Sequence, residues 1–129
     1  MQTAKGTLTH PKWDEQPYHE AAPQKSTMAI VEVVFAGDLE AKGNSRALMQ
    51  YTDEETCQYS GYVIVEGTLH GKAGTFILFE AGRYANATAN STWEIVPDSG
   101  TGALKGISGK GRYSAQHEGT VHYELTYEL

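Results

Sequence analysis

The sequence predicts an all-β protein, a closed barrel of eight antiparallel strands, and three observations lead there. Fourteen glycines and only four prolines divide the 129 residues into short apolar runs. Within those runs apolar and polar residues alternate with a period of two, which is the period of a β-strand. No run shows the periodicity of a long helix. Short strands joined by tight turns are typical of an antiparallel barrel or sandwich.

The first half of the chain supplies four predicted strands. Gly37-Asp38 ends the clearest of them, and Gly43-Asn44 precedes a shorter one. A turn at His70-Gly71-Lys72 then closes the long strand that follows. In chain order, the four strands are 5–10 with an extension past Pro11 to Trp13, 28–35, 47–51 and 59–69.

The second half supplies the other four strands. Pro97-Asp98-Ser99-Gly100 is a turn sequence that stops one strand, and glycines space the segment after it. The last strand alternates cleanly between apolar and polar residues up to Leu129. The four predicted strands are 75–84, 92–96, a segment from Leu104 through Tyr113, and 121–129. All eight are assigned to a single domain, residues 1–129.

Two of these strands, 28–35 and 75–79, are apolar on both faces. One face of such a strand fills a barrel, and the other needs a loop, an arm or a partner subunit over it. Alternation alone leaves open which face is inside. The residues predicted to be mostly buried are Val31, Val33, Phe35, Ile77, Phe79, Trp93, Leu125 and Tyr127.

Composition excludes several classes of function. The net charge is −6 and the ten lysines and arginines form no cluster, so we expect no nucleic-acid partner. No stretch approaches the ~20 apolar residues of a membrane span, and the N-terminus lacks the apolar run of a signal peptide. We therefore expect a cytoplasmic protein without a membrane partner. The single cysteine, Cys57, has no cysteine signature around it and is interpreted as a packed side chain rather than a nucleophile.

The histidines do not predict a metal site. No two of them have the i, i+2 strand spacing or the i, i+4 helix spacing of a ligand pair. The glycine-rich stretch 100–111 lacks the Gly-Lys-Ser/Thr ending of a phosphate-binding loop. We therefore expect neither a metal nor a cofactor. The five histidines are His10, His19, His70, His117 and His122.

Four segments together resemble a bacterial family, domain-of-unknown-function family 3224. They are Trp13-Asp14-Glu15, 37–43, 67–76 and 92–106, and they follow the family's order over nearly the whole chain. The resemblance implies a closed eight-stranded barrel similar to that of plant allene oxide cyclase, in agreement with the strand count. It implies no activity and no catalytic residue, since likeness to a cyclase in fold is analogy only.

Acidic residues are the candidates for catalysis. Glu32, Glu66, Glu80 and Glu94 each have apolar neighbours two residues away. On an inward face their pKa values would rise and split, as acid–base chemistry requires; on an outward face they would be solvated. Opposed residues on paired strands lie within roughly 5 Å. We therefore predict that at least two of these four and Glu15 meet in or at the mouth of the barrel.

Three functions stay open. The eight tyrosines and two tryptophans either fill the barrel or line a cavity in it, since eight strands are near the size at which one small ligand fits. The first function is binding of a small apolar or amphipathic molecule. The second is a carboxylate-based enzyme, either an acid-dependent aspartic-type peptidase or hydrolase, or a cyclase or isomerase by fold analogy. The third is a self-associating structural protein, a homo-oligomer that buries its doubly apolar strands.

Overall fold

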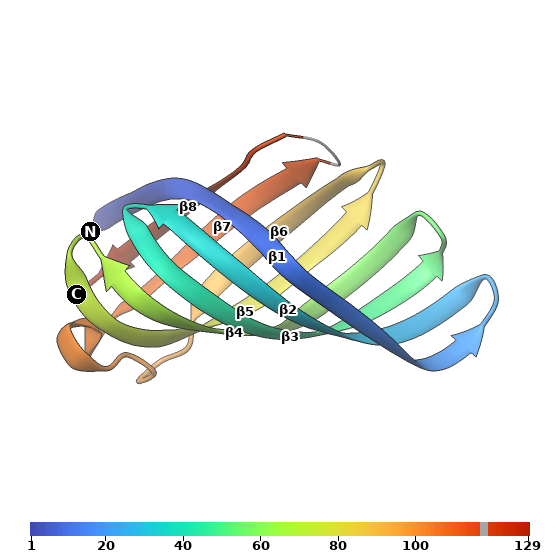
Figure 1. Cartoon of the computed structure of the whole chain (residues 1–129), viewed down its shortest axis with the longest axis horizontal. Coiled ribbons are helices and arrows are strands. Elements are labelled where there is room, and N and C mark those ends of the chain that lie inside the picture. Colours follow the sequence, from blue (N-terminus) through green and yellow to red (C-terminus); the bar gives the residue numbers. More distant parts are fainter. Residues whose placement is uncertain (117–118) are drawn as a thin grey trace.

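Eight antiparallel strands are hydrogen-bonded in a ring in the computed structural model, which describes residues 1–116 and 119–129 (Figure 1). Each strand pairs with the next one along the chain, and β1 pairs with β8. The predicted all-β arrangement of eight antiparallel strands is confirmed. The strands are β1 Gln2–Ala21, β2 Gln24–Gly37, β3 Leu39–Asp53, β4 Thr56–Leu69, β5 Lys72–Ala85, β6 Thr88–Ile95, β7 Ser108–Gln116 and β8 Val121–Glu128.

Helical structure in the described part of the chain is limited to one short 3₁₀ turn, η1 (Gly102–Leu104). Across residues 1–116 and 119–129, no helix is long and apolar enough to span a membrane.

The strands are longer than the sequence predicted. β1 continues through Pro11 and Pro17, and the pairing of β1 with β2 shifts register next to each of these prolines. Proline has no N–H to donate to a ladder, and irregular pairing of this kind is where a strand tolerates it.

The predicted break at Gly43 is wrong, because β3 begins at Leu39 and Gly43 lies in its interior. A Cβ atom on Gly43 would lie 2.9 Å from Cγ1 of Val63 and 3.0 Å from the ring of Phe35. This glycine therefore makes room for inward side chains of the neighbouring strands rather than ending a strand.

The two ends of the ring differ. The closed end carries both termini and η1 (left in Figure 1). There Leu104 and Ile107, from the segment between β6 and β7, are buried and join the hydrophobic core together with Leu39 and Leu69. The open end carries the hairpins β1–β2, β3–β4 and β5–β6. The core thus fills the ring at the closed end, so the space for a functional site lies toward the open end.

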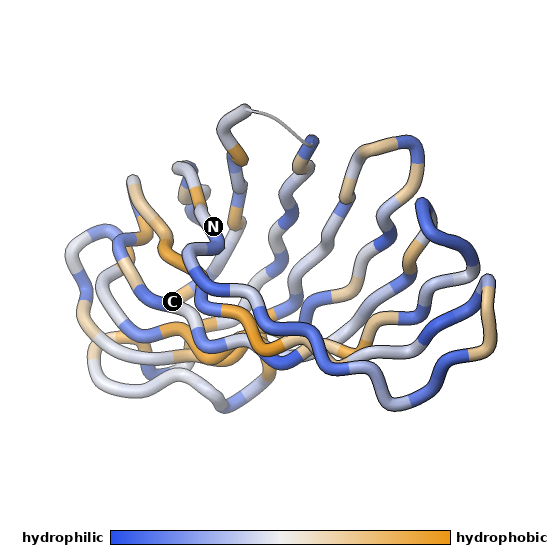
Figure 2. The backbone as a smooth tube through the Cα atoms, turned by 45° about the vertical axis from the view of Figure 1, so that its right-hand side comes forward, coloured by the Kyte–Doolittle hydropathy of each residue, from blue (hydrophilic) through white to orange (hydrophobic). Residues whose placement is uncertain are grey.

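Buried and more exposed residues alternate along most of β2, β6 and β8, and Figure 2 shows hydrophilic and hydrophobic positions interspersed along the backbone. Of the residues predicted to be buried, Val31, Val33, Phe35, Trp93, Leu125 and Tyr127 are confirmed.

The prediction for β5 is wrong by one position. Phe79 is 37% exposed and Ile77 is only half-buried, because β5 turns Phe76, Leu78 and Glu80 inward. A run that is apolar on both faces fits either orientation locally, so only its pairing with β4 and β6 decides which face is inside.

Candidate functional site

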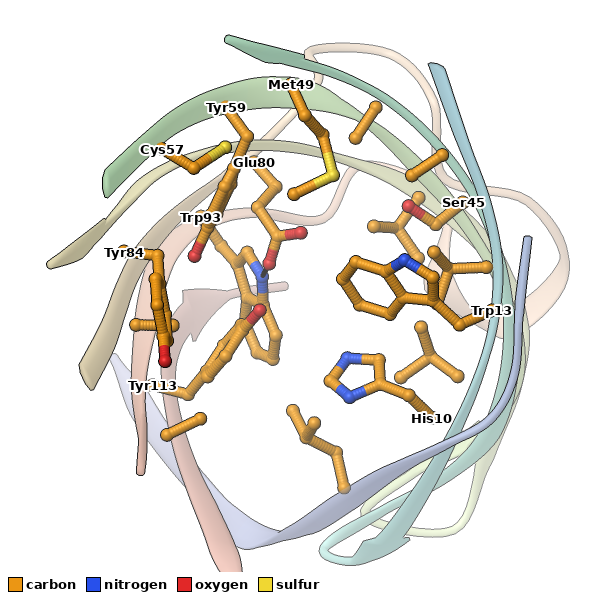
Figure 3. Close-up of a pocket in the computed structure, with 18 of the residues that line it drawn as sticks. His10, Trp13, Ser45, Met49, Cys57, Tyr59, Glu80, Tyr84, Trp93 and Tyr113 are labelled. Carbon is orange, nitrogen blue, oxygen red and sulfur yellow. Dashed lines mark hydrogen bonds between the residues drawn. The ribbon is translucent and has the colours of Figure 1, made fainter. Parts of the chain in front are cut away.

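A cavity of about 330 Å³ lies inside the ring toward the open end (Figure 3). Its lining comes from β1 to β7 and is mostly apolar, with Val31, Val33, Phe35 and Val63 among its walls. A small number of polar groups converge on the same space. This combination of apolar walls and few polar groups is the usual composition of a small-molecule site.

Several of the polar groups gather on one wall around Glu80 (Figure 3). Glu80 on β5 and Trp93 on β6 are cross-strand partners. The indole N–H of Trp93 donates a 2.8 Å hydrogen bond to Oε2 of Glu80, and Tyr113 on β7 lines the cavity beside them and helps to lower the pKa of the same carboxyl. Beside them the Tyr59 hydroxyl on β4 bonds to the buried Ser91 hydroxyl on β6. Four neighbouring strands thus place one carboxyl among aromatic donors.

The indole of Trp93 is fixed by close packing. Gly111 is its cross-strand partner on β7, and a Cβ atom at Gly111 would lie 2.9 Å from Cε3 of the indole. The ring also contacts Phe35, Tyr113 and Tyr123, with centroid separations of 5.6 to 5.9 Å. Such contacts on several sides hold the N–H in the orientation that Glu80 accepts.

Burial raises the pKa of Glu80, and the hydrogen bonds from Trp93 and Tyr113 offset only part of that shift. The same cause raises the pKa of Tyr113 well above its ordinary value, with a further contribution from the charge of Glu80. The cavity lining among the described residues includes no lysine and no arginine. Burial also lowers the pKa of His10, which favours its neutral form. The described lining of the cavity therefore supplies no lysine or arginine to compensate an ionised Glu80.

His10 and Trp13 of β1 form the facing wall of the cavity (Figure 3). Their rings meet edge to face at 5.7 Å, and the imidazole lies 6.4 Å from the ring of Tyr113. Trp13 is 51% exposed, so this wall borders on solvent. A bound molecule would lie between aromatic rings on two sides.

Three of the five candidate acids lie outside the ring. Each is exposed and has a lysine as its cross-strand partner. An acid opposite a lysine on the outer face remains solvated. The outward alternative therefore holds for these three. The pairs are Glu32 with Lys12, whose charged atoms are 3.9 Å apart, Glu66 with Lys42, and Glu94 with Lys110.

Glu15 lies near the open end and is already satisfied by the protein. Its carboxylate accepts hydrogen bonds from the Trp13 indole at 2.9 Å, the Thr27 hydroxyl at 3.0 Å and the Tyr51 hydroxyl at 2.8 Å. Among the five candidates, Glu80 alone is an inward carboxyl that lines the cavity.

No two of the five are cross-strand partners, so pairing across neighbouring strands does not bring two acids together. That two of them meet in or at the mouth of the barrel stays a prediction. A catalytic role for Glu15, Glu32, Glu66, Glu80 or Glu94 stays a prediction.

Cys57 also lines the cavity, but its environment favours packing over reactivity. It is 1% exposed, and burial together with the charge of Glu15 raises the pKa of its thiol to about 11. A thiol with such a pKa is protonated near neutral pH and is a poor nucleophile. No group of three or more His, Cys, Asp and Glu side chains in the described ranges could hold a metal ion; His117 lies outside them.

The grouping of Tyr59, Glu80, Trp93 and Tyr113 was not predicted from the sequence. These residues come from four strands, and no motif or fixed spacing links them. The one available signal is that Glu80 shares strand parity with Phe76 and Leu78, and it becomes informative only when that face is known to point inward.

Comparison with known proteins supports the fold. Residues 4–127 match the family described as "Protein of unknown function (DUF3224)". A crystal structure from Shewanella oneidensis MR-1, described as a protein with unknown function from the same family, superposes with a TM-score of 0.82. The match covers 100% of this chain and 97% of that one, at 24% sequence identity, and so shows the fold alone. No curated protein matches the chain.

Proposed function

This chain belongs to the DUF3224 family, and we propose that it is a binding protein that holds a small amphipathic molecule inside its ring of strands. The observation that carries the proposal is the cavity of about 330 Å³ with apolar walls and one polar cluster at Glu80. Ligand sites commonly measure ~300–1,000 Å³, so this volume suits a compact molecule. The apolar walls would hold its body and the Glu80 cluster its polar end.

Ligand binding explains the site better than a carboxylate-based enzyme does. An aspartic-type hydrolase needs two carboxyls that share a proton, whereas the second carboxyl of the lining, Glu54, is exposed in the β3–β4 hairpin. We also propose that the ring of strands forms an even barrel like that of allene oxide cyclase. That likeness is compatible with an internal ligand but carries no reaction.

The proposal is tested with N-phenyl-1-naphthylamine, an apolar dye whose fluorescence rises in apolar surroundings. Ala89 lines the cavity near the open end and is the position to fill. We expect the wild-type protein to enhance the dye's fluorescence and Ala89→Trp to abolish the enhancement. Ala36 is exposed outside the cavity, so Ala36→Trp is the matched control and should bind like wild type. Equal dye binding by Ala89→Trp would refute an internal site.

A second candidate function, self-association, is favoured by a separate observation on the outside of β4 and β5. Tyr62, Ile64 and Phe79 form an outer apolar patch in which they are 55%, 52% and 37% exposed. Tyr62 and Phe79 are cross-strand partners with ring centroids 5.4 Å apart. Exposed apolar clusters of this kind commonly mark interfaces.

We propose a second copy of the chain as the occupant of the outer apolar patch. The border of the patch carries both signs of charge, with Glu66 and Lys42 on one side and Glu94 and Lys110 on the other. A two-fold axis can therefore place a lysine of one copy against a glutamate of the other. Sedimentation equilibrium should show a dimer that Ile64→Lys converts to a monomer, while Thr7→Lys on the outside of β1 leaves it intact. A wild-type monomer at all concentrations would contradict this.

A further inference from the structure

Glu80 is a carboxyl in an apolar cavity whose described lining offers it a hydrogen bond but no lysine or arginine. Trp93 donates this hydrogen bond, and Tyr113 lies beside the carboxyl in the cavity lining. An ionised carboxylate in such surroundings is costly unless a cation compensates it. Glu15, by contrast, accepts hydrogen bonds from three side chains and borders the solvent.

The rings around Glu80 are suited to a cation. Trp93 and Tyr113 flank the carboxyl, Tyr59 and Tyr84 lie on the same wall, and Trp13 faces them across the cavity (Figure 3). Aromatic faces attract ammonium groups, most strongly when water is excluded, and tryptophan is the best of them. Several rings and one carboxylate around one space form the usual recognition set for an ammonium ion.

The β3–β4 hairpin adds acidic residues to the rim of the cavity, where Lys25 also lies over the ring of the lining residue Tyr51. The β3–β4 hairpin carries the consecutive acids Asp53, Glu54 and Glu55, and Glu54 lines the cavity itself. The chain has a net charge of −6. A negative rim raises the local concentration of cations and lowers that of anions.

We infer that the ligand carries an ammonium group, held between the carboxylate of Glu80 and the rings of Trp93 and Tyr113, with its apolar body in the rest of the cavity. This inference rests on the proposed binding function. It names the ligand class as amphipathic amines. A neutral ligand would leave Glu80 uncompensated when ionised, and an anionic ligand would add a second negative charge beside it.

The test compares three molecules with the same body and different ends: 4-phenylbutylamine, 4-phenylbutan-1-ol and 4-phenylbutyrate. Affinities for the wild-type protein are measured by displacement of N-phenyl-1-naphthylamine and by calorimetry. We expect the amine to bind about tenfold or more tightly than the alcohol, because a charged hydrogen bond contributes about 1.5–3 kcal/mol. The carboxylate should bind most weakly. This comparison needs no variant and so does not depend on the folding of one.

A variant then assigns the effect to Glu80. Glu80→Gln keeps an oxygen that accepts from Trp93 but removes the charge, and should weaken amine binding about tenfold to a hundredfold. It should change alcohol binding by less than about twofold. Glu40→Gln removes the same charge from an exposed position on β3 outside the cavity and is the matched control. It should leave both affinities unchanged.

The two proposals fail in different ways. If the dye binds and the amine gains nothing over the alcohol, or Glu80→Gln binds the amine like wild type, the ammonium inference is overturned and the cavity function stands. If neither the dye nor any of the three molecules binds, both are overturned.

Discussion

Trp93 donates its indole N–H to Glu80 over 2.8 Å, and the two residues are direct cross-strand partners on β6 and β5. The bond is part-buried in the cavity wall and stabilises the charged form of the carboxyl. It therefore couples the stability of the fold to the electrostatics of the site.

Trp93→Phe should destabilise the protein by about 1–3 kcal/mol, since a buried carboxyl loses its donor while an aromatic ring is kept. The pKa of Glu80 should rise further, because the indole bond lowers it. Urea denaturation and carboxyl titration by NMR measure the two effects. Trp13→Phe at a half-exposed position is the control and should leave the pKa of Glu80 unchanged. An unchanged Glu80 pKa in Trp93→Phe would show that the indole hydrogen bond does not stabilise the charged carboxyl.

Glu80 should contribute a component of stability that falls as pH rises above the ordinary glutamate pKa of ~4.3. The pKa of Glu80 is raised in the folded state, so the folded chain binds more protons than the unfolded chain between the two pKa values. The free energy of unfolding then decreases across that window and levels off above the folded-state pKa. Glu80→Gln should remove this component. The stability difference between variant and wild type, from urea melts between pH 4 and pH 8, should therefore shift in favour of the variant, and a constant difference would rule out a raised pKa.

Neighbouring residues on β5 should respond differently to truncation. Leu78 is fully buried and Phe79 is 37% exposed. Leu78→Ala should cost about 2–5 kcal/mol of stability. Phe79→Ala should cost about 1–2 kcal/mol, because a good part of its ring is already in water. Chemical denaturation of the two variants gives both values. The reverse order would place Phe79, and not Leu78, in the core.

Cys57 should react slowly with thiol reagents in the folded protein. Its side chain is buried and the pKa of its thiol is raised to about 11, so both access and thiolate fraction are low. Labelling by iodoacetamide at pH 8 should be at least about tenfold slower than in the urea-unfolded chain. Equal rates in the two states would show that the thiol is accessible.

Local alternation predicted the strands well but their ends poorly. Val31, Val33 and Phe35 share one face, because strand geometry sends every second side chain to the same side, and that face is buried as predicted. Gly43 was wrongly interpreted as the break before a strand. A single sequence does not distinguish a glycine that ends a strand from one that makes room for a neighbouring side chain. Val63, whose side chain occupies the space beside Gly43, is twenty residues away in the sequence.

The sequence by itself determined the all-β class, the eight strands, and the two side-chain sets of β5, one with Phe76, Leu78 and Glu80 and one with Ile77 and Phe79. Only the tertiary structure decided which set points inward. The period of a strand is two, so both orientations satisfy the same local pattern, and the choice depends on the register of β5 with β4 and β6. That choice places Glu80 beside Trp93 and Tyr113 while leaving Glu94 in water. The site exists because strand pairing brings together residues that no local rule connects.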